Sequence, residues 1–319
     1  MLKLLLPLDG SELSECALPH AFALASSFDA EITLLRVISP AEFRTGDSFS
    51  RVDWRLHRHQ AQAYLESIAE TFDTAGIRFD LRVEEGRPAE VIVETAHSLG
   101  INLLIMSTHG RGAATDFPRG GIAGKVLSAY RASVLLVSAR TESTLQSKAE
   151  YERLLVPIDG SYRSECALRV ATSLAQSLGA QLNVVYVAES SAVPSILSRD
   201  PRALALCQEL GEIVHRAAER DLAELRARLP QELRLRTGVI LADKTADPLA
   251  EIARRFNPDL IVASAEIVGG ANGSARSLIN AVSAVDRVPI LVLSPKGIGN
   301  VFCESRKFDG PDILTADVS

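Results

Sequence analysis

The sequence predicts an α/β fold made of two tandem, doubly wound domains, each with a five-stranded parallel sheet. The segment "PLDGSELSECAL" at 7–18 returns as "PIDGSYRSECAL" at 157–168, with nine of twelve positions identical. A chain of 319 residues also fits two domains of about 150 residues. Within each half, short runs rich in β-branched residues and Leu alternate with helical periodicity, which is typical of parallel strands joined by crossover helices.

The first half contains five apolar runs that predict strands and four periodic segments that predict helices. The strands are expected at Leu2–Leu8, Glu31–Ile38, Ile77–Val83, "NLLIM" (102–106) and "SVLLV" (133–137). The helices are expected at Glu12–Ser27, at about Asp53–Phe72, from "GRPAEVIVETA" (86–96) and from about Gly121.

The second half repeats this order. Its strands are expected at "RLLVPID" (153–159), "QLNVVYV" (181–187), "LRLRTGVIL" (233–241), "DLIVAS" (259–264) and "PILVL" (289–293). Its helices are expected from Ser161, over roughly thirty residues ending near Leu229, and at "DPLAEIARRF" (247–256). The predicted domains are therefore 1–139 and 151–295, joined by a polar linker at 140–150. Residues 296–319 lose the periodicity and are expected to form a mobile tail.

Composition and charge exclude several classes of protein. The chain is 47% hydrophobic and 23% charged, with no apolar run near the roughly 20 residues of a membrane span. No secretory signal follows the N-terminus, so we expect a cytoplasmic protein. The net charge of -6 argues against a nucleic-acid partner. The four cysteines form no CxxC pair, and we expect Cys16 and Cys166 to be buried free thiols.

A glycine-rich loop follows the fourth strand of the first half, in "MSTHGRGAATDFPRGGIAGKVL" at 106–127. Glycines let a backbone approach oxyanions closely, and a helix that starts at Gly120–Gly121 would direct unpaired N–H groups at them. The loop is therefore a candidate phosphate site. A tight strand-to-helix connection also requires glycines, so this structural explanation stays open.

Asp9 ends the first predicted strand, which places its carboxylate at the edge of a doubly wound sheet where ligands bind. The alternative explanation is local. Asp9 can cap the helix that begins near Glu12 or form an Asx turn, and Ser11 can share that role. The two roles are compatible.

With these residues in view, the chain resembles the universal stress proteins, in the tandem form that carries two such domains. Members that bind ATP have an Asp at the end of strand one and the signature G-x2-G-x9-G-S/T after strand four. Here Ser107 and Gly121 replace the first Gly and the Ser/Thr, while Gly110 and Gly120 match. The resemblance implies that Asp9 and its neighbours meet adenine and ribose, that Val37 lines the base pocket, and that Gly110 and 120–123 hold the phosphates.

The resemblance thus implies ATP as ligand, with Mg²⁺ held through the phosphate oxygens. The implied binding residues are Pro7, Leu8, Asp9, Val37, Met106, Ser107, His109, Gly110, Gly120, Gly121, Ile122 and Ala123. A hydrogen bond to a charged group contributes roughly 1.5 to 3 kcal/mol, so the absent hydroxyl at Gly121 is expected to weaken ATP by about one to two orders of magnitude.

The second copy departs from the signature. Ile267 stands where Gly110 does in the first half, and Arg276 stands opposite Gly120. The segment "SARSLIN" resembles the corresponding segment in the subclass of the family that lacks the glycine signature. We therefore expect one ATP per chain, with Asp159 serving only as a capping residue.

The remaining candidates support neither a metal site nor a catalytic site. His57 and His59 lie two residues apart on a predicted helix and so point to different faces, while His20, His97 and His215 are expected to be partly buried structural residues. Two alternatives to a stress-response ATP-binding module remain. One is an ATP hydrolase or nucleotidyl-transfer enzyme with Asp116 in the loop, and the other is an interaction scaffold without nucleotide.

The last strand of each half is an apolar edge, and such edges are normally covered or paired. We expect "SVLLVSA" and "PILVLSP" to pair and join the two domains as an internal pseudo-dimer. This arrangement leaves room for a homodimer of two chains.

Overall fold

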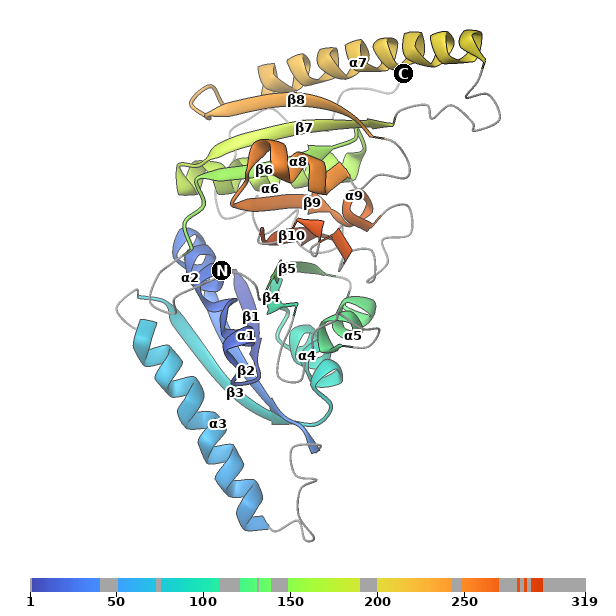
Figure 1. The fold of residues 1–319 in the computed structure, drawn as a ribbon. Helices are drawn as coiled ribbons and strands as arrows, with labels where there is room; N and C mark the ends of the chain where they lie inside the picture. The colour runs from blue at the N-terminus through green and yellow to red at the C-terminus, as the bar shows by residue number, and fades with distance from the viewer. Residues whose placement is uncertain are drawn as a thin grey trace.

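Ten strands form one continuous sheet in the computed structural model (Figure 1). The structure describes residues 2–40, 51–72, 76–108, 121–130, 132–138, 149–189, 200–242, 248–269, 280–281, 284–285 and 288–294. The first half contributes β1 (Lys3–Leu8), β2 (Glu31–Ile38), β3 (Arg78–Glu85), β4 (Leu103–Ser107) and β5 (Ser133–Val137). The second contributes β6 (Arg153–Ile158), β7 (Gln181–Glu189), β8 (Leu235–Ala242), β9 (Leu260–Ser264) and β10 (Ile290–Leu293).

The strand order is β3-β2-β1-β4-β5-β10-β9-β6-β7-β8. All pairs within a half are parallel, as expected for strands connected by crossover helices. In each half the order reverses beside the first strand, between β1 and β4 and between β6 and β9. Doubly wound sheets bind ligands at such points, beyond the carboxyl ends of the strands.

The two halves meet where β5 pairs with β10, and this pair is antiparallel. Leu135 lies opposite Leu291, and both side chains are fully buried. The edge of each half is therefore covered by the other half, which removes two apolar strand edges from solvent. A second contact lies nearby, because the Ala149 N–H donates to the Pro19 carbonyl across 3.2 Å.

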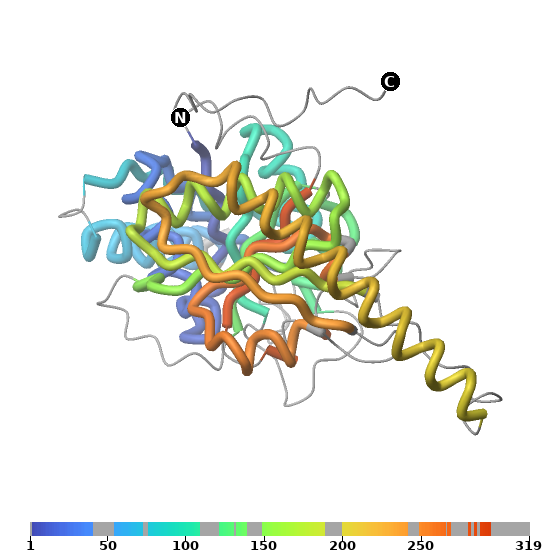
Figure 2. The backbone as a smooth tube through the Cα atoms, turned by 90° about the horizontal axis from the view of Figure 1, so that it is seen from above, coloured from blue at the N-terminus to red at the C-terminus, as the bar shows by residue number. Residues whose placement is uncertain are grey.

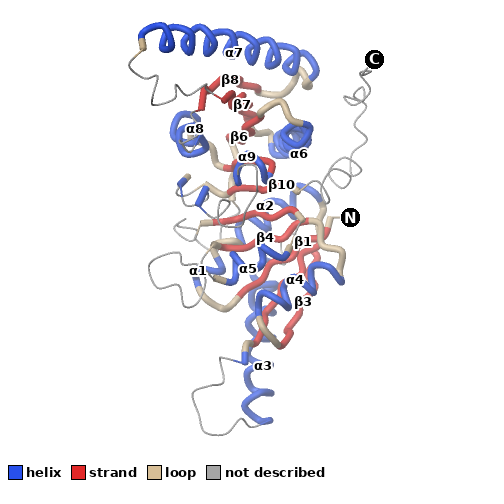
Figure 3. The backbone as a smooth tube through the Cα atoms, turned by 90° about the vertical axis from the view of Figure 1, so that its right-hand side faces the viewer, coloured by secondary structure: helices blue, strands red, loops and turns tan. Residues whose placement is uncertain are grey.

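Helices cover both faces of the sheet, and Figure 3 shows α6 and α8 on opposite sides of the second-half strands. One buried cluster joins strand residues to α2 (Leu18–Phe28), α3 (Arg51–Phe72), α6 (Tyr162–Leu178) and α7 (Pro201–Arg228), and it also includes Cys16, directly after α1 (Glu12–Glu15). The other joins them to α4 (Pro88–Ser98), α5 (Ile122–Ala129), α8 (Pro248–Phe256) and α9 (Ala265–Gly269). Each cluster contains residues of both halves, so the apolar core continues across the β5–β10 junction.

The structure confirms the α/β fold with two similar halves, but one predicted helix is wrong. The segment expected as a single helix at Glu12–Ser27 is split into α1 and α2. Pro19 explains the break, because its ring has no N–H to donate to the Glu15 carbonyl and collides with it. Arg169 takes the equivalent place in the repeat, and α6 runs unbroken for 17 residues. The short helix α9 was not expected.

Other side chains follow the expectations in part. Cys16 is buried and Cys166 half-buried, and both are free thiols. His97 is exposed rather than partly buried, although its ring lies 5.5 Å from that of Tyr130. In the part of the chain that the structure describes, no helix is long and apolar enough to cross a membrane, and no three His, Cys, Asp or Glu side chains gather to hold a metal.

Candidate functional site

The carboxyl ends of β1 and β4 bring several predicted site residues to one edge of the sheet. Leu4 and Leu5 of β1 pair with Leu103 and Leu104 of β4, and this register continued forward brings Leu8 level with Ser107. Leu8, Val37, Met106 and Ser107 are all buried at this edge. The Thr108 N–H donates to the Val137 carbonyl across 2.9 Å, which fixes the chain as it leaves β4.

Asp9 begins the turn that leads out of β1. Its Oδ1 accepts hydrogen bonds from the Ser11 N–H at 3.0 Å and from the Ser11 hydroxyl at 2.5 Å. Ser11 is the N-cap of α1, and its Oγ accepts from the Ser14 N–H at 3.2 Å. Gly10 lies between them with a φ of 78°, which a residue with a Cβ rarely adopts. Asp9 therefore forms an Asx turn while Ser11 caps the helix.

A polar cluster next to Asp9 was missed by the sequence analysis. The Tyr64 hydroxyl, on α3, donates to Glu15 Oε1 on α1 across 2.7 Å. Burial raises the pKa of Tyr64, and so do the bond and charge of Glu15 and the charge of Asp9, whereas the charge of Arg36 lowers it. The charges of Asp9, Glu15 and Arg36 thus all lie close enough to Tyr64 to influence it.

Arg36 is the cation of this cluster. It lies on β2, where it pairs in register with Leu8, and it is buried. Its Nη1 donates to the Val37 carbonyl at 2.6 Å. Arginine is rarely buried unless its charge is paired. Arg36, the one charged residue in the buried run "ITLLRVI", was the signal that could have identified this cluster.

The N-terminus of α5 is open toward the described residues. Gly121 is its N-cap, without a side-chain hydrogen bond to the helix, and among the described residues a Cβ built on Gly121 would meet no neighbouring atom within 4 Å. The first N–H groups of a helix have no partner inside it, so this end can receive an anion. Ile122 is exposed and Ala123 is buried. His109, Gly110, Asp116 and Gly120 lie outside the described residues.

The second half builds the same turn again. Asp159 Oδ1 accepts from the Ser161 N–H at 2.9 Å, and Ser161 is the N-cap of α6. Burial by itself would raise the pKa of Asp159, but hydrogen bonds from Ser161 and Ser164 outweigh it and hold the pKa below its ordinary value. This carboxylate is therefore engaged in a structural role.

An aromatic side chain lies over this second turn. A Cβ on Gly160 would come within 2.7 Å of the Tyr186 hydroxyl oxygen. Tyr186 pairs with Ile158 as Arg36 pairs with Leu8, so a phenol stands where the first half has a guanidinium. Beyond β9 the chain enters α9 at once, where the Ile267 N–H donates to Ser264 Oγ at 3.5 Å. Arg276 lies outside the described residues.

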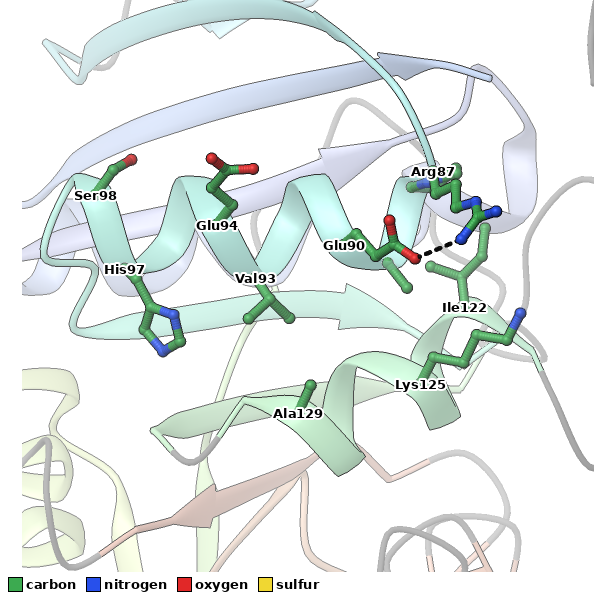
Figure 4. Close-up of a pocket in the computed structure, with 11 residues that line it drawn as sticks. Arg87, Glu90, Val93, Glu94, His97, Ser98, Ile122, Lys125 and Ala129 are labelled. Carbon is green, nitrogen blue, oxygen red and sulfur yellow. Dashed lines mark hydrogen bonds and ion pairs between the residues drawn. The ribbon is translucent and has the colours of Figure 1, made fainter. Parts of the chain in front are cut away.

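A separate groove of about 1110 Å³ lies between α4 and α5. Figure 4 shows Glu90, Glu94 and His97 on α4 and Lys125 on α5 around it. Arg87 and Glu90 form an ion pair of 3.1 Å at its end, but both side chains are largely exposed, where such pairs contribute little. Of the predicted site residues that the structure describes, only Ile122 lines this groove, so the groove is distinct from the carboxyl edge of β1 and β4.

The chain was compared with models of known protein families and with curated proteins. The model of the universal stress protein family matches residues 1–138 and 150–283, one match in each half. A universal stress protein of Methanocaldococcus jannaschii is 28% identical over 137 residues, which are 42% of this chain and 81% of the relative.

Two solved structures share the arrangement of both halves. A universal stress protein from Archaeoglobus fulgidus DSM 4304 matches with a TM-score of 0.63 and 18% identity, over 92% of this chain and 96% of the other. A protein of unknown function from Pseudomonas aeruginosa PAO1 matches with a TM-score of 0.62 and 15% identity, over 95% of each chain. At these identities the likeness shows the fold.

Proposed function

The chain belongs to the universal stress protein family, and from this premise we propose that its first half binds ATP at the carboxyl edge of β1 and β4. Mg²⁺ would be held there through the phosphate oxygens. The second half is a structural copy of the same domain. The protein would act as a nucleotide-dependent module of the stress response.

The observation that carries this proposal is the open N-terminus of α5. Gly121 has no capping side chain, and no neighbouring atom of the described residues lies within 4 Å of where its Cβ would be. Phosphate oxygens can therefore approach the unpaired N–H groups of the first turn, which also lie at the positive end of the helix dipole. The space and the donors both fit a phosphate group.

The adjacent edge fits the nucleoside. Leu8, Val37 and Met106 are buried apolar side chains at the ends of three strands and supply a surface for a base. Asp9 is held in place by Ser11, so its carboxylate is a fixed acceptor for ribose hydroxyls. Arg36 adds a positive charge on the neighbouring strand, which offsets part of the negative charge of Asp9 and Glu15.

The second half differs where Tyr186 stands. The Tyr186 hydroxyl lies over the Asp159–Gly160 turn, and this argues against a ribose there. We therefore propose one ATP per chain.

Calorimetric titration with MgATP tests the proposal. Gly120→Val adds branched bulk next to the N-cap of α5 and is expected to abolish binding. Asp159→Ala is the matched control in the other half. It should leave the affinity unchanged while costing about 1 kcal/mol of stability, because it removes the hydrogen bond that Ser161 donates. Two equivalents of ATP per chain, or binding that survives Gly120→Val but not Asp159→Ala, would show that the wrong half has been assigned.

Gly121→Ser is expected to tighten ATP, because it restores the hydroxyl of the family signature. One added hydrogen bond to a charged group predicts an improvement of about tenfold or more. Gly121→Ala is the matched control, since it adds the Cβ without the hydroxyl and meets no neighbouring atom. Equal affinity for all three proteins would contradict the alignment of this loop with the signature.

A further inference from the structure

Helix α7 carries an apolar face that does not pack on its own domain. Figure 2 shows the N-terminal part of α7, in yellow, extending away from the rest of the molecule. Leu206, Leu210 and Ile213 are 67%, 41% and 55% exposed. Together with Ala217 they form a row along the helix, which we call the outer stripe. Large apolar side chains gathered at one exposed place commonly mark an interaction surface.

The outer stripe is distinct from the face by which α7 packs on the sheet. Ala218 and Leu222 are buried and belong to that inner face. A Cβ on Gly211 would lie 3.8 Å from Leu241 Cδ1 on β8, so Gly211 also points toward the sheet. The stripe residues lie beside this face, around the helix toward solvent.

The equivalent helix of the first half shows that the fold does not require such a stripe. Ala61 and Leu65 are the buried pair of α3, as Ala218 and Leu222 are of α7. When these pairs are aligned, the stripe positions 210, 213 and 217 correspond to Asp53, Leu56 and Gln60. Only one of the three is apolar in α3. The apolar stripe is therefore a property of α7 alone.

The spacing of the stripe is that of a coiled coil. Its residues follow one another at intervals of four, three and four, which is the repeat of the two core positions of a heptad. We propose that the outer stripe binds the outer stripe of a second copy of this chain in antiparallel orientation, and so forms a homodimer. This dimer is independent of the proposed nucleotide site.

Antiparallel pairing follows from the shape of the stripe. Rotation about its midpoint brings Leu210 against the partner's Ile213 and Leu206 against the partner's Ala217. Large side chains then meet in the middle and a large one meets a small one at each end, which fills the space between two helices evenly.

Charge complementarity fits the same orientation. Glu209 and Arg216 are exposed on the edge of the stripe that faces away from the sheet. The antiparallel rotation places Glu209 beside the partner's Arg216, and Arg216 beside the partner's Glu209. A parallel pair would place Arg216 beside the partner's Asp221 but Glu209 beside the partner's Val214, so only the antiparallel pair gives both charges an opposite neighbour. Edge charges of this kind influence the orientation of paired helices.

The ion pair that Arg216 makes in its own helix does not prevent this. Arg216 Nη2 lies 2.9 Å from Glu212 Oε2, but the two side chains are 70% and 69% exposed. A pair so exposed contributes little, and Arg216 can interact with two carboxylates at once.

Sedimentation equilibrium of the full chain without nucleotide is the first test. We expect a dimer, and Leu206→Gln combined with Ile213→Gln should raise its dissociation constant by at least about tenfold. Leu56→Gln on α3 is the matched control, because Leu56 is an equally exposed apolar residue at the equivalent of Ile213. It should leave the dimer unchanged. A chain that is monomeric at every concentration, or a dimer insensitive to the stripe substitutions, would overturn the proposal.

Charge reversal tests the orientation. Glu209→Arg places like charges opposite each other at both ends of its own dimer, and so does Arg216→Glu. Each variant alone should therefore dimerise at least about tenfold more weakly than the native chain. Mixed together, the two variants restore both pairs and should form a heterodimer of near-native affinity. A mixture that associates no better than either variant alone would rule out antiparallel pairing.

Discussion

The two halves of the chain share the same backbone fold and differ in the side chains around the turn that follows the first strand of each half. Both leave their first strand through the same Asx turn, with Asp9 and Asp159 each bonded to the serine two residues on. Yet Arg36 stands beside the first turn and Tyr186 lies over the second. The comparison shows that one turn can stand beside different residues of the neighbouring strand. Under the proposed function, that residue determines whether the turn can bind a ligand.

The first helix of each half provides a second contrast. Pro19 and His20 stand in α2 where α6 has Arg169 and Val170. Pro19 breaks the helix, and His20 Nδ1 lies 2.7 Å from the Tyr151 hydroxyl in the second half of the chain. In the first half, the helix is therefore interrupted next to the residue that makes a polar contact with the second half.

The largest expected effect on stability comes from introducing proline into α6, at the position equivalent to Pro19. Arg169→Pro removes an N–H inside the unbroken helix α6 and is expected to destabilise the protein by about 3 kcal/mol or more. Arg169→Ala separates the backbone effect from loss of the side chain and should be much milder. Denaturant unfolding measures both. If Arg169→Pro were as stable as Arg169→Ala, proline would not be the cause of the break in the first half.

His20 is expected to make the stability of the protein depend on pH, with a maximum effect similar to that of Arg169→Pro. Burial lowers its pKa from 6.5 to about 4, so the folded state resists protonation while the unfolded state accepts it. Stability is therefore highest above pH 6.5 and is lost as the pH falls toward 4, by up to about 3 kcal/mol.

The variant that isolates this effect copies the second half. His20→Val introduces the residue found at Val170, and Tyr151→Phe removes the hydroxyl that would otherwise lose its partner. Unfolding of the double variant should show a weaker decline between pH 6.5 and 4 than the native chain. An unchanged decline would assign the pH dependence to other groups.

The smallest effect concerns the two turn glycines. Gly10 and Gly160 have φ values of 78° and 77°, so alanine at either position is strained by about 1 to 2 kcal/mol. Gly160→Ala also collides with the Tyr186 hydroxyl and should be the more destabilising of the two. Adding Tyr186→Phe should remove that excess, and chemical denaturation reports it. Equal losses with and without the tyrosine hydroxyl would show that Tyr186 does not confine this turn.

The sequence predicted the strands well because each is a compact apolar run. It predicted the turn at Asp9 because this segment occurs again in the second half. It did not predict the cluster of Glu15, Arg36 and Tyr64, since these residues come from three elements whose mutual placement depends on packing. The position of Tyr186 over Gly160 was missed for the same reason. The break at Pro19 was different, because proline inside a helical pattern is a local signal.

The antiparallel junction of β5 and β10 has a consequence for how such a chain diverges. Two identical subunits joined along an edge are encoded by one gene, so every substitution appears at both sites at once. Here the two partners of the edge are encoded separately and held at a high effective concentration by the chain itself. One site can then change under selection while the other is left intact, and the assembly no longer depends on how much protein the cell makes.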